Sequence, residues 1–281
     1  MNKAGIVMTL MLLAGGTAAS QQLSVMSYNI RYDNPGDAPN NWENRKDFLI
    51  SQIAWHAPDV VGTQEGLIHQ LRDMDAGLGD YAFFGRGRDQ VDEAGEHAAI
   101  FYRQDRLELL KEGTFWLSLT PDVPSKGWDA ALNRVCTYGL FRERQTGREF
   151  YVFNTHFDHV GEVARRESVN LILRQMAALN TAGLPQVLCG DLNLEPESAP
   201  IRLLASSMAD THTLAGALTY GPAGTFNGFD CTREPTRRID YIFTGPGDFR
   251  VLGNAVLSEF TGTGFPSDHF PVLARLAFAG E

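Results

Sequence analysis

Apolar residues follow two different spacings along this chain, and these spacings predict its helices and strands. Positions three and four apart predict helices over Glu43–His56, Leu67–Leu78 and Glu162–Leu179. Shorter apolar or alternating stretches, bounded by turn residues, predict strands. The expected strands are Leu23–Ile30, Asp59–Gly62, Ala98–Tyr102, Leu107–Leu117, Arg134–Glu143, Glu149–Phe157, Gln186–Cys189, Ile239–Phe243, Phe249–Leu257 and Pro271–Phe278.

The order of these elements indicates an α/β protein with two packed sheets. Helices alternate with strands near both ends, but the middle third is strand after strand. The turn residues Gln145–Arg148 join two of these strands as a hairpin. A purely parallel, doubly wound sheet fits this order less well than two mixed sheets packed face to face with helices outside.

Composition, together with the lack of a dividing linker, supports one globular domain over residues 21–281. The chain has 281 residues, of which 43% are hydrophobic and 21% charged, so a buried core is expected. Neither a repeat nor a Pro/Gly/Ser-rich linker divides it. The formal net charge of -10 argues against a non-specific nucleic-acid binder, which needs a phosphate-neutralising surface.

The first 20 residues are typical of an export signal. Lys3 precedes an apolar run over Ile6–Ala14, and small residues follow, with cleavage expected after Ala19 or Ser20. The run is too short for a membrane span of about 20 residues. We therefore expect a secreted or periplasmic protein without a stable membrane span. Cys189 sits in an apolar strand and is expected in the core.

Polar residues interrupt six of the predicted strands or follow their ends. Each one alone has an ordinary structural explanation, such as a turn or a helix cap. Asp240 is the exception, because a carboxylate buried among apolar neighbours needs a partner, which we expect to be His269. Loops at one end of a sheet converge in space, so the six segments predict one cleft. They are Tyr28–Arg31, Gln64–Glu65, Asn154–His159, Gly190–Asn193, Arg238–Phe243 and Ser267–Val272.

These motifs, in this order, resemble those of the endonuclease/exonuclease/phosphatase superfamily. The resemblance runs from Leu23 to Phe278. It implies a four-layer α/β sandwich, with two mixed sheets flanked by helices. It also implies hydrolysis of a phosphodiester or phosphomonoester by water, assisted by Mg²⁺, for which Mn²⁺ is a possible substitute. Hydrolysis requires charge neutralisation on phosphate oxygens, an aligned water and a protonated leaving group.

The resemblance assigns the metal site to three residues. Glu65 matches the principal metal ligand, and Asn29 lies beside it. Asp268 matches a position that holds or approaches a second cation. Carboxylate and amide oxygens are the ligands that Mg²⁺ prefers.

The remaining matched residues take catalytic or substrate-binding roles. His269 matches the catalytic histidine that Asp240 orients, and Asp191 matches the residue that positions or deprotonates water. The other matches are Asn193 as a ligand of a phosphate oxygen, His156 as a histidine on the other side of the phosphate, and Arg134 as a phosphate-contacting arginine.

Two alternatives stay open at this point. Asn154–His159 resembles the zinc signature of metallo-β-lactamase-like hydrolases, although Asn154 replaces its first histidine and the later histidine ligands are missing. A catalytically silent binding protein on the same fold is the other. The substrate also stays open between nucleic acid, a lipid headgroup and a small molecule, and the chain is expected to act as a monomer.

Overall fold

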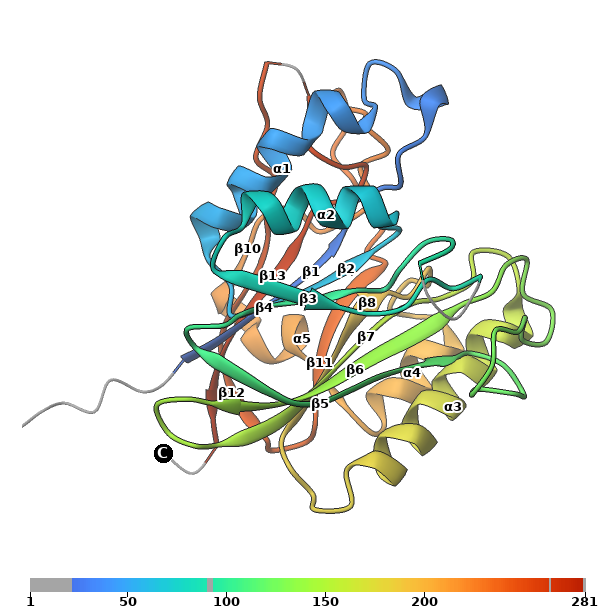
Figure 1. Ribbon diagram of the computed structural model, residues 1–281, viewed down its shortest axis with the longest axis vertical. Helices are drawn as coiled ribbons and strands as arrows, with labels where there is room; N and C mark the ends of the chain where they lie inside the picture. Colours follow the sequence, from blue (N-terminus) through green and yellow to red (C-terminus); the bar gives the residue numbers. More distant parts are fainter. Residues whose placement is uncertain (1–21, 90–92, 263, 280–281) are drawn as a thin grey trace, which may run out of the picture.

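Two β-sheets form the centre of the computed structural model, which describes residues 22–89, 93–262 and 264–279 (Figure 1). The first sheet has the strand order β10-β12-β13-β1-β2-β4-β3. Here β1 and β2 run parallel, and β13 and β4 flank them in antiparallel pairing. Its strands are β1 (Gln22–Asn29), β2 (Val60–Gln64), β3 (Tyr81–Phe84), β4 (Ile100–Arg103), β10 (Thr219–Tyr220), β12 (Phe249–Val256) and β13 (Val272–Phe278).

The second sheet has the order β5-β6-β7-β8-β11-β9. Its parallel pair is β7 with β8, and β11 pairs with β8 in the antiparallel sense. The mixed character of both sheets follows from this pairing. The strands are β5 (Leu107–Trp116), β6 (Val135–Glu143), β7 (Glu149–His156), β8 (Gln186–Asp191), β9 (Ala209–Asp210) and β11 (Asp240–Thr244).

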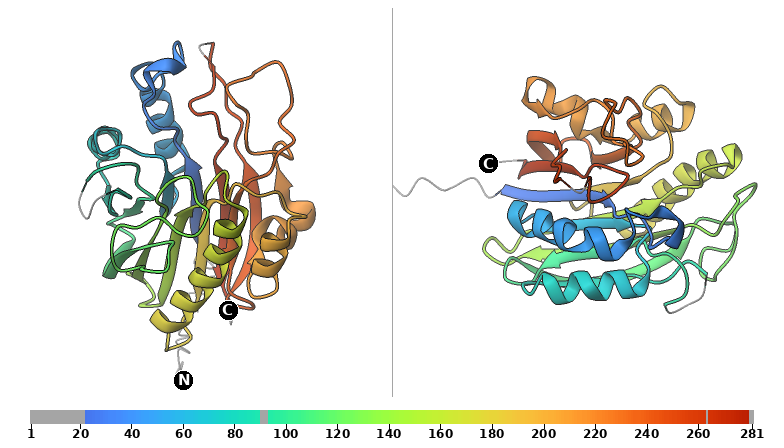
Figure 2. Two further views of the ribbon diagram at one scale, coloured as in Figure 1. Left: turned by 90° about the vertical axis from the view of Figure 1, so that its right-hand side faces the viewer. Right: turned by 90° about the horizontal axis from the view of Figure 1, so that it is seen from above.

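Helices cover the outer faces of both sheets (Figures 1 and 2). Helices α1 (Trp42–His56) and α2 (Ile68–Gly77) pack on the first sheet, and α3 (Glu162–Leu179) and α4 (Ala199–Ala205) on the second. The short α5 (Thr211–Ala215) contacts β11 and β12. The predicted four-layer α/β sandwich is therefore confirmed.

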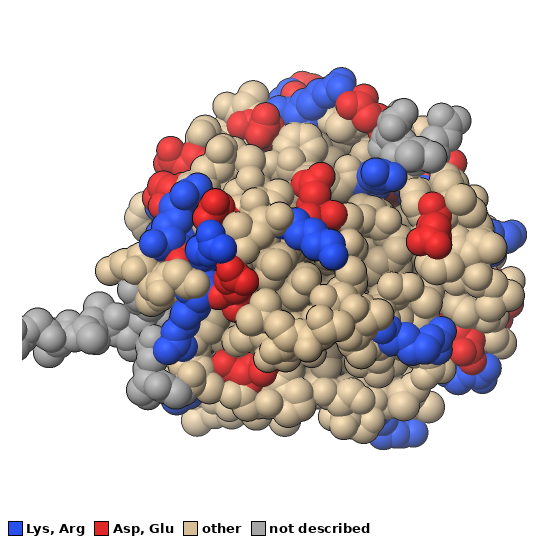
Figure 3. Space-filling model, turned by 60° about the horizontal axis from the view of Figure 1, so that its bottom comes forward, with Lys and Arg blue, Asp and Glu red and all other residues tan. Residues whose placement is uncertain are grey.

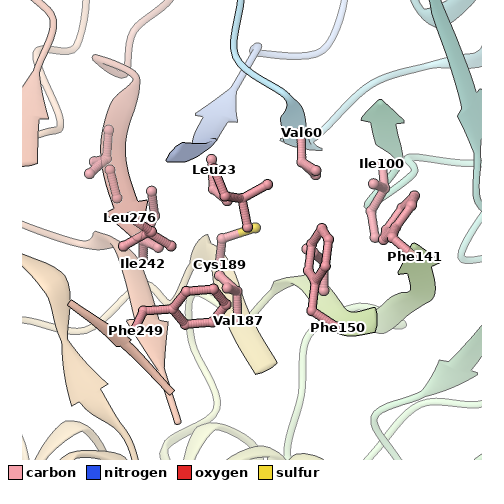
Figure 4. Close-up of a cluster of buried hydrophobic side chains, with 14 of the residues drawn as sticks. Leu23, Val60, Ile100, Phe141, Phe150, Val187, Cys189, Ile242, Phe249 and Leu276 are labelled. Atoms are coloured by element: carbon pink, nitrogen blue, oxygen red, sulfur yellow. The ribbon is translucent and has the colours of Figure 1, made fainter. Parts of the chain in front are cut away.

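The largest apolar cluster lies between the two sheets (Figure 4). Leu23 and Val60 from the first sheet face Phe150, Val187 and Ile242 from the second, and each is at most 1% exposed. Burying a side chain of this kind stabilises the fold by about 1.5–3 kcal/mol. This central layer fixes the two sheets against each other. It therefore fixes the positions of their strand ends relative to one another.

Most predicted elements are found within a few residues of their expected bounds, and α3 matches at both ends. Strand β2 continues two residues beyond its expected end, through Thr63 and Gln64, although both are polar. Gln64 is fully buried because its Nε2 donates to Asn154 Oδ1 of the other sheet at 2.7 Å. The sequence analysis missed β3, α4, α5 and the two-residue strands β9 and β10.

Gly62 on β2 lies where side chains of the second sheet leave no room for a Cβ atom. A Cβ at this position would lie 2.5 Å from Cys189 Sγ and 2.8 Å from Asn154 Oδ1. We expect Gly62→Ala to lower the free energy of unfolding by about 1–3 kcal/mol through overpacking. Gly79→Ala is the matched control, because its Cβ would meet nothing within 4 Å. Equal urea midpoints for the two variants would contradict this packing.

Three sequence expectations have separate outcomes. Cys189 is 1% exposed in the core, as predicted, and Cys136, Cys189 and Cys231 are all free thiols. The expected signal peptide, residues 1–20, lies outside the described residues. None of the described helices is long and apolar enough to cross a membrane.

Candidate active site

Four functional positions lie where two parallel strand pairs end. Asn29 ends β1 and Glu65 directly follows β2, while His156 ends β7 and Asp191 ends β8. The register pairs Asn29 with Gln64 and His156 with Asp191. Because parallel strands end at the same edge of a sheet, these side chains meet there.

The antiparallel neighbours bring the remaining positions to the same edge. Asp240 opens β11 and pairs in register with Asp191. Asp268 and His269 precede β13, and the Ser267 hydroxyl donates to the Asn29 carbonyl at 2.6 Å. All six polar segments expected from the sequence therefore contribute to one site.

Asn29 and Asp191 form the centre of the site. The Asn29 amide nitrogen donates to Glu65 Oε1 and to Asp191 Oδ2, both at 3.0 Å. The Asp191 carboxylate is 1% exposed, and burial and the charge of Asp240 raise its pKa. Asn29 thus orients two carboxylates that belong to different sheets.

Glu65 and Asn193 have backbones in the left-handed region, with φ of 65° and 50°. Such conformations are uncommon for residues other than glycine, and they concentrate at functional sites. The backbone amides of Tyr32 and Asn193 donate to Glu65 Oε2 and Asp191 Oδ1 at 3.2 and 2.9 Å. The strand ends are therefore shaped to present these side chains.

The expected pairing of His269 with Asp240 is confirmed. His269 Nδ1 donates to Asp240 Oδ2 at 2.9 Å, and the Thr225 hydroxyl donates to the same oxygen at 2.5 Å. Burial opposes the charged imidazolium, but the Asp240 and Asp191 carboxylates outweigh it and raise the pKa of His269 to about 10. Asp240 therefore holds a charged imidazolium whose Nε2 faces the cleft.

This pairing predicts a pH-dependent contribution to stability. The folded-state pKa of His269 lies above its ordinary value of 6.5. Its stabilising contribution is therefore complete below about pH 6.5 and is lost as the pH rises towards 10. In EDTA, we expect the unfolding free-energy difference between wild type and His269→Gln to shrink from about pH 6 to about pH 10. Urea unfolding measures it, and a difference that stays constant would contradict the pairing.

His156 has the opposite electrostatic environment. Burial, followed by the Arg134 and Arg88 guanidinium groups, holds the pKa of His156 well below its usual value. Its Nε2 accepts from Asn193 Nδ2 at 3.1 Å and lies 3.5 Å from Asp191 Oδ2. His156 is therefore neutral here.

Both histidines approach the same carboxylate. His269 Nε2 lies 3.8 Å from Asp191 Oδ2, the oxygen that His156 also approaches. The two imidazoles face the same space, as predicted. His269 is positively charged there, whereas His156 is neutral. One can stabilise negative charge while the other accepts a hydrogen bond.

The oxygen-rich end of the site fits a hard divalent cation. Ligand atoms of Glu65, His156 and Asp191 lie within 4.8 Å of one another. Arg31 lies 3.8 Å from a carboxylate oxygen of Glu65 and of Asp268. Burial and the charge of Glu65 raise the pKa of Asp268, so this end carries closely spaced negative charge. A cation bound by carboxylates would relieve that repulsion.

Asn29 presents its nitrogen, rather than its oxygen, to Glu65. Its Oδ1 accepts from the Arg31 backbone amide at 3.0 Å. In this arrangement Asn29 supports Glu65, and its role as a direct metal ligand stays a prediction.

Arg134 enters the cleft from the loop before β6. Its side chain is 6% exposed, with Nε 3.4 Å from Asp158 Oδ1 and Nη2 3.1 Å from His159 Nδ1. Asp158 also accepts from the backbone amides of Val160 and Gly161. These contacts commit Asp158 to the loop and the arginine, so the Asn154–His159 segment does not present the suspected zinc signature.

The cleft has a volume of about 830 Å³ and includes residues that the sequence analysis missed. Arg88 and Glu96 line it from the loop between β3 and β4, and Phe226 and Arg237 line another part. Phe226 packs edge-on against His269, with ring centroids 5.1 Å apart. Glu96 lies four residues before β4. Its place close to a predicted strand was the one feature of the sequence that could have indicated a role in the site.

Four stacked layers with a carboxylate- and histidine-lined cleft at the strand ends define an α/β sandwich with one candidate active site. The chain belongs to the Endonuclease/Exonuclease/phosphatase family, whose model matches residues 26–269. The similar proteins of this family are phosphoester hydrolases, and the family is generally dependent on divalent metals. The metallo-β-lactamase-like alternative gives way to this assignment, whereas a measurement of turnover tests the silent binding protein on the same fold.

Solved structures and curated proteins include several similar chains. A mannosyl-6-phosphatase of Bacteroides thetaiotaomicron VPI-5482 is 40% identical, with a TM-score of 0.88 over 91% of this chain and 100% of that one. The human Nocturnin catalytic domain, 21% identical with a TM-score of 0.74 over 92% of this chain and 95% of that one, shares the fold.

Nocturnin of Drosophila melanogaster is 25% identical over 298 residues, which cover 90% of this chain and 45% of that protein. The Ccr4 exoribonuclease subunit of Aspergillus clavatus is 22% identical over 94% of this chain and 54% of that protein. The chain thus spans about half the length of these two curated relatives.

Proposed function

We propose that this protein is an exported, Mg²⁺-dependent hydrolase of small phosphate esters, with sugar phosphates as the preferred class. The similarity to the mannosyl-6-phosphatase supports this class most directly, because it extends over 91% of the chain at 40% identity. Export is supported by the N-terminal sequence, and we propose a monomer. Mn²⁺ would substitute for Mg²⁺.

Surface charge favours a small substrate over a long nucleic acid. Acidic side chains outnumber basic ones, 34 to 24. Acidic and basic side chains of the described residues are also interspersed on the one face that Figure 3 shows. A long polyanion normally requires a continuous basic stripe, whereas a small phosphate ester needs cations only inside the cleft.

The residues divide into three roles in the proposed reaction. Glu65 and Asp268 would hold the cation, supported by Asn29, and the cation would withdraw charge from the phosphate oxygens. Asp191 would orient the attacking water and accept its proton, since its Oδ2 lies at the centre of the site.

The other side chains would bind the phosphate. Charged His269, held by Asp240, would stabilise negative charge on a phosphate oxygen. Asn193 and Arg134 would donate to other oxygens. Neutral His156 would contact the leaving-group side, where a hydrogen-bonded water can supply the proton.

A substrate panel tests the proposed class. The mature protein would be assayed, with and without Mg²⁺, on mannose 6-phosphate, an inositol phosphate, sphingomyelin and oligonucleotides. We expect the highest kcat/KM on the sugar phosphate. Faster cleavage of an oligonucleotide or of sphingomyelin would contradict the proposed substrate class. Equal turnover without a divalent cation would contradict the proposed requirement for Mg²⁺.

A further inference from the structure

A second arginine, Arg88, lines the cleft beside Arg134 and His156. Arg88 lies in the loop after β3 of the first sheet, and Arg134 lies just before β6 of the second. Both are buried, with 8% and 5% of their surface exposed. Two guanidinium groups from different sheets therefore flank a histidine that carries no charge.

The backbone of Arg88 is held in place on both sides. Its carbonyl accepts from Trp116 Nε1 at 2.7 Å and from Asn133 Nδ2 at 3.3 Å, and its amide donates to the Glu96 carbonyl at 3.0 Å. Asn133 is the neighbour of Arg134, so the same contact ties the two arginines together. The position of Arg88 is thus built into the fold.

Among the described residues, the Arg88 side chain has one close carboxylate and one buried donor without a partner. Nη1 donates to Glu96 Oε2 at 2.6 Å, and Asp89 lies 4.0 Å from Nε. Nε is buried and has no hydrogen-bond partner among the described residues. A buried donor without a partner is unfavourable, so the Arg88 guanidinium as a whole gains from a further acceptor.

The acids near these arginines do not occupy all of the guanidinium donors. Asp158 lies 3.4 Å from Arg134 but also accepts from several loop amides, and Glu96 contacts Arg88 through a single oxygen. A guanidinium suits phosphate oxygens because its fork of donors matches their geometry. The chemistry at this end of the cleft is therefore that of an anion site.

Phosphate monoesters and diesters differ in their charge and in the number of terminal oxygens that can accept hydrogen bonds. A monoester carries about −1.5 to −2 charge near pH 7 and three terminal oxygens. A diester carries one negative charge and two such oxygens. Two guanidinium groups and His269 in one cleft offer donors for a third terminal oxygen, which only the monoester has.

We propose that Arg88, oriented by Glu96, binds the additional terminal oxygen of a phosphate monoester and so selects monoesters over diesters. This inference rests on the proposed function, since it concerns the same cleft. It names Arg88 as the residue that determines the preference for monoesters over diesters.

A matched pair of esters tests the selection. We would measure kcat/KM, with Mg²⁺, for p-nitrophenyl phosphate and for its methyl diester. In Arg88→Met we expect kcat/KM for the monoester to fall about 10–100-fold, the range of one lost charge-assisted hydrogen bond, and that for the diester to fall less than about threefold. Equal losses for both esters, or no loss, would overturn the inference.

Two further variants separate selection from damage to the loop. Arg88→Met leaves Glu96 without its partner, whereas the double variant Arg88→Met/Glu96→Gln removes both charges together. We expect the same loss of selection in the double variant; retained selection would count against Arg88. Arg72→Met is the matched control, because Arg72 is 62% exposed and pairs with Glu93 of the same loop. It should leave the ratio unchanged.

Binding of non-reacting anions gives a readout that does not depend on turnover. With Mg²⁺ present, titration calorimetry would compare inorganic phosphate with dimethyl phosphate. Arg88→Met should weaken phosphate binding about 10-fold or more and dimethyl phosphate binding less than about threefold. If wild type hydrolyses neither ester but shows this difference, the proposed function fails and the role of Arg88 stands. Parallel changes for both anions would refute that role.

Discussion

Replacing His269 with alanine is expected to lower kcat by about 10²–10⁴-fold, the range that a positioned general acid–base group contributes. The imidazole is 4% exposed, bonded to Asp240 and directed at the cleft. Its loss removes a positive charge that lies 3.8 Å from the Asp191 carboxylate. Steady-state kinetics on the best substrate of the panel, with saturating Mg²⁺, measure the effect.

We expect His156→Ala to lower kcat by a factor in the same range, because the Nε2 atoms of His156 and His269 approach the same Asp191 oxygen. The double variant should lose less than the product of the two single losses, since both side chains act on one transition state. A single variant within a few-fold of wild type would show that its histidine is structural. A single cooperative unfolding transition in each variant is the control for folding, because loss of the His269–Asp240 pair is itself expected to lower the midpoint.

Glu65→Gln carries the second large expected effect. The change keeps the size of the side chain but removes a negative charge beside Asn29 and Asp191. We expect Mg²⁺ to bind at least about 10–100-fold more weakly, the loss seen when even a supporting residue of a metal site is removed. Calorimetric titration with Mg²⁺ measures this independently of substrate.

The activity of Glu65→Gln should respond to the metal concentration. At limiting Mg²⁺ the loss should be largest, and high Mg²⁺ should restore part of it. Glu149→Gln is a suitable control, because Glu149 pairs with Arg142 on β6 and β7 away from the cleft. Full activity of Glu65→Gln at limiting Mg²⁺ would show that Glu65 does not hold the cation.

The fold was predictable wherever burial and periodicity coincide. Helix α3 was found at both ends because its apolar positions repeat at helical spacing. Strand β3 was missed because its four residues, Tyr81–Phe84, are too few to define a period. The extension of β2 through Gln64 depends on Asn154 of the other sheet, which local sequence cannot reveal.

The site was predictable where a polar residue conflicts with its surroundings. Asp240 lies among apolar residues, and its partner proved to be His269, 29 positions away. Arg88 and Glu96 gave little such signal, because charged residues in a loop are ordinary. Their burial arises from the packing of the Arg88 loop against Trp116 and Asn133.

The central claim is metal-dependent hydrolysis of a small phosphate ester at this cleft. Its most direct test is phosphate release from mannose 6-phosphate by protein stripped with EDTA, before and after Mg²⁺ is restored, in wild type and Asp191→Asn. We predict that Mg²⁺ restores turnover to wild type and leaves the variant at least about 10²-fold slower. Undiminished turnover in EDTA, or an Asp191→Asn variant as active as wild type, would contradict it.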